Sequence, residues 1–228
     1  MDVVILAGGK GTRLAPHTNE KPKPLVRVAG KPILAHVLSS LPQSITRALV
    51  ITEFEQEQVQ TFCAEYPSDI PIICIPQIEM RGTYGALKSA ETLVSDSFLV
   101  INGDDIHTAG DLTTMFTHER SFGVSKRVKP GYHAILKNQT GMLAGMRPQT
   151  SDELSLGTNI ATGAYVLDMD FFELPPQQLK NGEYGIPHTL VIASDAYPVT
   201  VIDMPHWISI NTPDDLIAGE RELLSRTT

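Results

Sequence analysis

Two positively charged side chains near the N-terminus accompany a glycine-rich turn. Residues 7–11, Ala-Gly-Gly-Lys-Gly, directly follow the apolar run 3–6, which predicts a buried strand. Glycines at three of four positions leave room for a polyphosphate against the backbone, and successive N–H groups in such a turn can bind an anion. Arg13 and Lys23 add fixed positive charge, with Lys23 held between two prolines in stiff, extended backbone. Together these features predict a nucleoside triphosphate site.

The turn matches neither of the common phosphate-binding motifs. Residues 9–14 lack the third glycine of the dinucleotide fingerprint and the Gly-Lys-Ser/Thr ending of the Walker loop. An oxidoreductase that uses a dinucleotide is disfavoured, because the second expected strand ends without an acidic ribose clamp beyond Glu53. A plain tight turn followed by a solvated lysine is the alternative interpretation of these residues.

A carboxylate pair follows another expected strand. Asp104 and Asp105 come just after the apolar run 98–101. An aspartate at a strand end can bind Mg²⁺, which usually takes one or two protein carboxylates together with phosphate oxygens. A turn or helix-capping role suits the same residues, and the spacing alone does not rank the two aspartates.

The elements that would position these residues alternate through the first half of the chain. Such alternation predicts an α/β fold with a Rossmann-like, mainly parallel sheet flanked by helices, whose ligands bind at the carboxyl ends of the strands. The second half predicts a mixed or antiparallel extension of the sheet that carries an acceptor pocket. We expect one domain over 1–228, with a nucleotide-binding half at 1–120 and an acceptor-binding half at 121–228. The expected strands are 3–6, 47–52, 70–75 and 98–101, and the expected helices are 32–41, 55–66, 85–94, 170–174, 186–194 and 213–224.

The composition of the chain indicates which classes of binding partner and which location are expected. The formal net charge of −8 disfavours a nucleic-acid or anionic membrane partner, so cations for a triphosphate must be gathered locally, as around Arg13 and Lys23. Cys63 and Cys74 fit neither a disulfide framework nor a zinc site and are expected to be buried. The N-terminus does not resemble a signal peptide and no apolar run is long enough to span a membrane, which predicts a cytoplasmic protein.

The pattern as a whole resembles the sugar-1-phosphate nucleotidyltransferase family (NDP-sugar pyrophosphorylases). The resemblance rests on Leu-Ala-Gly-Gly-Lys-Gly-Thr-Arg-Leu at 6–14, Pro-Lys-Pro-Leu at 22–25 and Gly-Lys-Pro at 30–32, and it continues in the family's order to residue 216. It implies the nucleotide-diphospho-sugar transferase fold and Mg²⁺ as cofactor. It also implies transfer of a nucleoside monophosphate from a triphosphate to a sugar 1-phosphate, giving an NDP-sugar and pyrophosphate.

The resemblance also assigns roles to residues. Arg13 corresponds to the arginine that holds the β- and γ-phosphates, Lys23 to the lysine between the reacting phosphates, and Asp104 to a metal ligand. Nucleotide contacts are implied for Leu6, Ala7, Gly8, Gly9, Gly11, Thr12, Gln77, Gly82 and Thr83. Acceptor contacts are implied for Asn102, Tyr132, Arg147 and Gly163.

Departures from the family gather in the acceptor and metal half. Ser209 stands where the family has a second metal-binding aspartate, and a hydroxyl is the poorer ligand, although Asn211 offers an amide oxygen two residues on. Met146 and Arg147 replace a glutamate–lysine pair, and His133 replaces a glycine. Either the acceptor is smaller or less hydroxylated than a hexose phosphate, or turnover is weak or absent.

Three hypotheses follow. The first is a Mg²⁺-dependent nucleotidyltransferase whose partners are a nucleoside triphosphate and a sugar 1-phosphate. The second is a cytidylyltransferase for a non-sugar phosphate such as phosphocholine. The third is a sensor that binds a nucleotide or NDP-sugar without turnover. The nucleobase, the sugar and the oligomeric state stay open.

Overall fold

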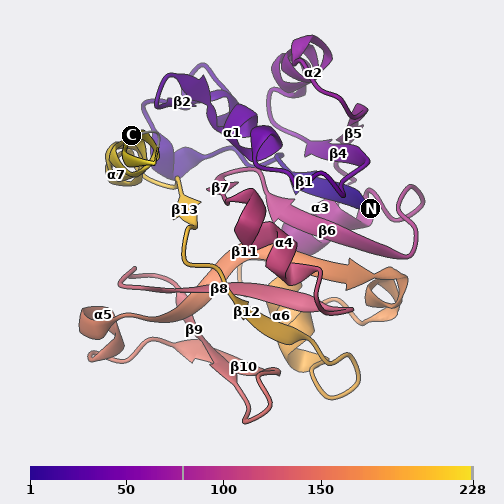
Figure 1. The fold of residues 1–228 in the computed structure, drawn as a ribbon, viewed down its shortest axis with the longest axis vertical. Helices are drawn as coiled ribbons and strands as arrows, with labels where there is room; N and C mark the ends of the chain where they lie inside the picture. Colours follow the sequence, from indigo (N-terminus) through magenta and orange to yellow (C-terminus); the bar gives the residue numbers. More distant parts are fainter. Residues whose placement is uncertain (79, 227–228) are drawn as a thin grey trace.

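The computed structural model describes residues 1–78 and 80–226. Its centre is a seven-stranded sheet in the order β12-β8-β11-β6-β1-β4-β5, and β11 alone runs antiparallel to its neighbours (Figure 1). The strands are β1 (Asp2–Leu6), β4 (Arg47–Thr52), β5 (Ile72–Pro76), β6 (Ser97–Asn102), β8 (Ser121–Arg127), β11 (Thr158–Asp168) and β12 (Thr200–Asp203). The expected boundary at 120/121 falls where β8 begins, and the β6–β11 pairing carries the sheet across it.

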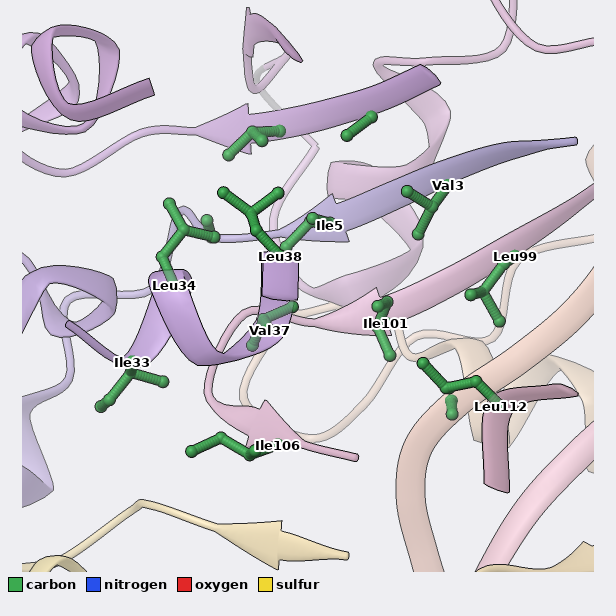
Figure 2. Close-up of a cluster of buried hydrophobic side chains, with 14 of the residues drawn as sticks. Val3, Ile5, Ile33, Leu34, Val37, Leu38, Leu99, Ile101, Ile106 and Leu112 are labelled. Carbon is green, nitrogen blue, oxygen red and sulfur yellow. The ribbon is translucent and has the colours of Figure 1, made fainter. Parts of the chain in front are cut away.

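Helices pack on both faces of this sheet because its central strands are apolar on both sides. Figure 2 shows one face, where Val3 and Ile5 of β1 meet the side chains of α1 (Ile33–Ser39). Val4 points to the opposite face and packs with α3 (Thr83–Lys88) and α6 (Ile186–Ile192). Successive side chains of a strand alternate between faces, so one apolar run serves two cores. The first face also carries α2 (Gln56–Glu65), α4 (Ala109–Met115) and α7 (Pro213–Ser225).

Smaller elements build the rest of the second half. β9 (His133–Lys137) and β10 (Leu143–Pro148) form an antiparallel pair beside α6, followed by α5 (Glu153–Leu156). β7 (Asp105–Ile106) pairs with β13 (Ile208–Ser209), and β2 (Arg27–Val28) pairs with β3 (Lys31–Pro32). Short 3₁₀ helices lie at η1 (Thr12–Leu14), η2 (Lys23–Leu25) and η3 (Met169–Glu173). Within the described residues, no helix is both long and apolar enough to cross a bilayer.

The expected elements of the first half are present, with one difference in length. The structure places a strand at each of the four expected positions, within two residues at either end. The helix expected over 85–94 begins at Thr83 and ends at Lys88. Beyond it the backbone continues in turns, with bonds such as Ala90 N–H to the Leu87 carbonyl. The segment 170–174 is a 3₁₀ helix within η3, and the long strand β11 had no complete counterpart among the expected elements.

Candidate active site

A cavity of about 920 Å³ opens at the carboxyl ends of β1 and β6. The loop after β1 and the loops after β5 and β6 line it from the first half of the chain. Residues of β9, β10, β11 and α6 line it from the second half. The loops that follow β1 and β6 therefore meet at the carboxyl ends of the strands, where ligands of an open α/β sheet bind.

The glycine turn lies at this rim in tight contact with its neighbours. A Cβ on Gly8 would come within 3.0 Å of Gln77 Oε1, whereas one on Gly9 would meet nothing within 4 Å. Gly11 has φ +64°, and a Cβ there would approach Lys23 Cβ to 2.8 Å. Gly11 thus allows Lys23 to pack against the turn, and Gly9 leaves the cavity side open for a ligand.

Two cations and two oxygen ligands meet in this cavity. Lys23, only 8% exposed, donates from Nζ to an Asp104 carboxylate oxygen and to Asn211 Oδ1, the latter over 2.8 Å. Arg13 donates from Nη2 to the same Asn211 oxygen over 3.0 Å, while the rest of its side chain is exposed. A buried lysine is stable when it is paired in this way. Arg13, Lys23 and Asp104, which are far apart in sequence, are brought together as expected.

The pairing of β7 with β13 sets this geometry. Ser209 lies opposite Asp105 in the antiparallel ladder, and the Ile210 N–H donates to the Asp104 carbonyl over 3.1 Å. The Asn211 N–H then donates to Asp215, whose carboxylate also completes the capping box of α7. Asn211 is thereby fixed across from Asp104.

The oxygen that faces Lys23 beside Asp104 belongs to Asn211, the residue whose amide oxygen the sequence offered as an alternative to the Ser209 hydroxyl. Ser209 Oγ lies 2.6 Å from Asn211 Nδ2 and 3.3 Å from the Tyr132 hydroxyl, on the opposite side of the carboxamide from Lys23. Residue 211 lies beyond the end of β13, where its backbone N–H is bonded to Asp215 and its side chain lines the cavity. Asn211 lines the cavity, and Ser209 does not.

Asp105 has a structural role that differs from capping a helix. It is buried in β7 and accepts hydrogen bonds from Trp207 Nε1 over 2.8 Å and from Asn102 Nδ2 over 2.9 Å. Burial raises the pKa of Asp105, and the negative charge of Asp104 adds to this effect. Asn102 lines the cavity as expected, although its amide nitrogen is engaged with Asp105.

Gly163 sits at a break in the β11–β8 register, between Ala161 and Tyr165. Its φ is +71°, and a Cβ there would overlap Asn102 Nδ2 and Asp105 Oδ2. Glycine is therefore needed both for the backbone conformation and for the approach of Asp105. The register break is a β-bulge, and Gly163 lines the cavity.

The loop after β5 supplies the residues expected at a nucleobase. Gln77 donates from Nε2 to the Met80 carbonyl over 3.1 Å, and its Oε1 lies near Gly8. Gly82 has φ +92°, and a Cβ there would meet the Tyr184 backbone nitrogen at 2.7 Å. Thr83 Oγ1 accepts from the Ile186 N–H over 3.0 Å, so its hydroxyl anchors α6. All three expected residues line the cavity with Leu6, Ala7 and Thr12.

Arg147 is not brought into the cavity with the other acceptor residues. Met146 lies opposite Ile135 and Arg147 lies opposite Ala134, so Met146 and Ile135 share the cavity face. Arg147 lies on the other face, where it makes two hydrogen bonds with Glu153, of 2.7 and 2.9 Å. That pairing lowers the pKa of Glu153 to about 2. The alternation of a strand explains why the expected acceptor contact of Arg147 was wrong.

Two histidines line the part of the cavity that β9, β10 and α6 form. The rings of His133 and His188 meet edge to face at 6.2 Å, and Nδ1 of His188 is buried without a hydrogen-bond partner in the described part of the chain. Burial lowers the pKa of His188, and His133 lowers it further. His188 was missed by sequence reasoning. Its helix was expected, but the face that α6 turns to the cavity depends on the packing of α6 against β10.

The donor set suits a divalent cation that keeps most of its own water and phosphate ligands. The described residues hold no group of three or more His, Cys, Asp or Glu side chains that would cage a metal ion. Asp104 and Asn211 nevertheless direct two oxygens at one point, where the Lys23 ammonium now lies. Mg²⁺ is commonly held by one or two protein oxygens together with substrate phosphates.

The family model described as Nucleotidyl transferase matches residues 2–128, which is more than half of the chain. The chain belongs to the nucleotidyl transferase family. The match covers the glycine turn, both cations and Asp104.

Curated relatives align over the whole length of this nucleotidyl transferase. The bifunctional protein GlmU of Methanococcus maripaludis (strain C7) is 26% identical over 230 residues, which cover 99% of this chain and 55% of that protein. The chain thus spans about half the length of the GlmU relatives that it matches. The UTP–glucose-1-phosphate uridylyltransferase AglF of Haloferax volcanii is 28% identical over 242 residues, with coverage of 100% and 98%.

Solved structures share the fold of this nucleotidyl transferase. The inositol-1-phosphate CTP transferase from T. maritima matches with a TM-score of 0.79 at 20% identity, covering 99% of this chain and 95% of that one. The Rossmann-like, mainly parallel sheet flanked by helices is therefore confirmed as the fold of nucleotidyltransferases.

Proposed function

We propose that this chain transfers a nucleoside monophosphate from a nucleoside triphosphate to a sugar 1-phosphate, releasing pyrophosphate. The observation that carries the proposal is the meeting of Arg13, Lys23 and Asp104 with the glycine turn in one cavity. The full-length relative AglF, named as a UTP–glucose-1-phosphate uridylyltransferase, supports a sugar 1-phosphate as the first acceptor to test.

The chain's own groups account for the chemistry by positioning and charge. A phosphate oxygen of the acceptor attacks the α-phosphorus of the triphosphate, the α–β bridging bond breaks, and its electrons leave with pyrophosphate. No protein nucleophile is required for such a transfer. Arg13 suits bidentate contact with the β- and γ-phosphates, and Lys23 lies where it can screen repulsion between the two reacting phosphates.

Mg²⁺ is part of the proposal, with Asp104 and Asn211 as the residues that would hold it. When bound, it would neutralise charge on the triphosphate and on the departing pyrophosphate. Lys23 occupies the point between the two oxygens in this structure, so it is expected to turn toward phosphate when the metal site fills.

The acceptor end favours a ligand with fewer hydroxyls than a hexose phosphate. Its walls include Ile135, Met146 and Pro187, with His133 and His188 among the polar groups, and Arg147 faces away. A non-sugar phosphate such as phosphocholine is therefore the second candidate acceptor, with a cytidine nucleotide as donor. We propose the cytoplasm as the site of the reaction in either case, because both substrates are charged and phosphorylated.

Pyrophosphate release tests both candidates. The purified chain is incubated with Mg²⁺, each common nucleoside triphosphate, and a panel of sugar 1-phosphates that includes deoxy sugars and phosphocholine. Release that requires one triphosphate and one acceptor is the expected result. Tight nucleotide binding without release for any pair would contradict the transferase proposal and favour a nucleotide sensor.

A further inference from the structure

We propose that Ser209 and Tyr132 are positioning residues, which hold the carboxamide of Asn211 with its oxygen toward Asp104 and the metal ion. The inference rests on the proposed metal site and assigns a function to the serine that stands where the family resemblance implies a carboxylate. It also moves the Tyr132 hydroxyl from acceptor binding to the orientation of Asn211.

The Asn211 amide nitrogen donates one of its two hydrogens to each of the two hydroxyl oxygens. Nδ2 donates to Ser209 Oγ over 2.6 Å and to the Tyr132 hydroxyl over 3.0 Å. Asn211 is only 7% exposed, so an amide hydrogen turned away from these oxygens would be left unpaired in the interior. Leaving a buried donor unpaired costs roughly 1–3 kcal/mol, enough to select one orientation.

The hydroxyl pair accepts more readily than it donates at this place. Tyr132 and Ser209 lie 3.3 Å apart, so one hydroxyl hydrogen is used between them. The pair then presents two acceptor oxygens but only one remaining hydrogen to the carboxamide. Two N–H groups supply a donor to each of these oxygens. An amide oxygen turned to this side could accept only the one remaining hydrogen while the bond between the hydroxyls is kept, and it would face the other hydroxyl oxygen with no hydrogen between them.

Cations hold the other end of the carboxamide, but only until phosphate arrives. Asn211 Oδ1 accepts from Lys23 Nζ over 2.8 Å and from Arg13 Nη2 over 3.0 Å. In the proposed reaction both cations turn to phosphate oxygens, and their restraint on the oxygen end is lost. Ser209 and Tyr132 remain, because they contact only the nitrogen end.

The backbone keeps both hydroxyls in place independently of the ligand. Ser209 is fixed in β13 opposite Asp105, and the Tyr132 ring packs edge to face on Trp207 at 6.2 Å. The Trp207 indole is in turn bonded to Asp105. The positioning groups are therefore tied to the segment that carries Asp104.

Mn²⁺ binding in two backgrounds tests the inference. The four common nucleoside triphosphates are first compared as α,β-methylene analogues, and the analogue that binds most tightly is kept. Electron paramagnetic resonance then measures the affinity of the protein for Mn²⁺ in the presence of that analogue and without any acceptor. Ser209→Ala should weaken Mn²⁺ binding on the order of tenfold. The same change in an Asn211→Asp background should alter Mn²⁺ affinity by less than about twofold, because both ends of a carboxylate are oxygens. Tyr132→Phe should show the same dependence on background.

The controls separate this inference from folding defects and from the proposed function. Ser39→Ala removes an exposed hydroxyl on α1 that donates to the His36 carbonyl of its own helix, and it should leave Mn²⁺ affinity unchanged. Equal losses from Ser209→Ala in both backgrounds, or no loss in either, would overturn the positioning role. Absence of Mn²⁺ binding by the unaltered protein would instead overturn the metal site, and the inference with it. Neither result depends on which acceptor the protein uses.

Discussion

A single oxygen of Asn211 joins the two cations of the cavity, and one of them, Lys23, is also paired with Asp104. Because Arg13 and Lys23 both donate to this oxygen, two cations from different loops converge on the point that Asp104 also faces. Like charges held so close are stabilised when an anion joins them. In the proposed function this point is a preformed site for phosphate oxygens, which would let an acidic chain bind a triphosphate.

At the same scale, Arg13→Ala should lower turnover by a factor of about 100 to 1000, which is typical for the loss of one group that stabilises the transition state. Arg147→Ala is the matched control, since Arg147 is paired with Glu153 outside the cavity. Its effect on turnover should stay within about twofold. The kcat of both variants checks this, and near-normal turnover of Arg13→Ala would remove its assigned role.

Sequence reasoning found the residues that lie in continuous motifs and misjudged those that depend on register. The turn, Arg13, Lys23 and Asp104 follow strand ends, so their meeting was predictable from the rule for open sheets. Arg147 differs because one residue of shift reverses the face of a strand. Asn211 lies beyond the end of β13, and the direction of its side chain depends on contacts with Asp215, Lys23 and Arg13 that come from other parts of the chain. The local pattern of apolar and polar residues does not predict which strands β13 and β10 pair with.

At the scale of elements, the bulge in β11 should be sensitive to a single methyl group. Gly163→Ala adds a clash with Asn102 and Asp105 to the cost of positive φ. Gly141→Ala carries the backbone cost alone, because Gly141 has φ +81° with nothing within 4 Å. We expect a loss of about 1 kcal/mol for Gly141→Ala and at least about 2 kcal/mol more for Gly163→Ala. Equal losses in urea unfolding would contradict this account of the bulge.

His107 of the segment after β7 should make stability depend on pH. It is buried, and neither ring nitrogen has a hydrogen-bond partner of normal geometry among the described residues, although the Thr162 backbone lies close enough to the ring to raise its pKa slightly. Burial lowers its pKa to about 4, outweighing the opposite effects of Asp111 and Thr162. The unfolded state, with a pKa of about 6.5, binds the proton first as pH falls, so this contribution is complete above pH 6.5 and lost toward pH 4.

The loss assigned to His107 is about 2 kcal/mol between pH 7.5 and 5, calculated from the difference between the two pKa values. Urea unfolding of the unaltered protein and of His107→Gln at both pH values isolates it, because the other titrating groups are common to the two proteins. The variant should show a shallower dependence on pH. An identical dependence would mean that His107 is already charged in the folded state.

Helices and strands were predictable from the sequence wherever apolar residues recur at a clear helical or strand spacing. The parallel strands and α7, with its Thr212–Asp215 capping box, match local sequence signals closely. The helix after Gly82 was placed too far along the chain, because apolar spacing continues through turns that follow Lys88. β11 was missed as one strand because Gly163 interrupts its alternation.

At the scale of the whole molecule, the β6–β11 pairing joins the two halves of the chain through one sheet. We expect both halves to unfold together in a single transition. Trp207 is the only tryptophan and is buried beside the cavity, so its fluorescence reports on the site while circular dichroism reports on the whole chain. The two transitions should coincide in urea. Earlier loss of tryptophan fluorescence would indicate that the acceptor half unfolds separately.

The fate of the α-phosphorus tests the central claim most directly. Each common nucleoside triphosphate, labelled with ³²P at the α-position, is incubated with Mg²⁺ and the acceptor panel, and the products are separated. The account predicts label in a nucleoside-diphosphate conjugate of one acceptor, unlabelled pyrophosphate, and no label on the protein. Label that stays in the triphosphate while the protein binds it, or that appears only as nucleoside monophosphate, would contradict transfer to a phosphorylated acceptor.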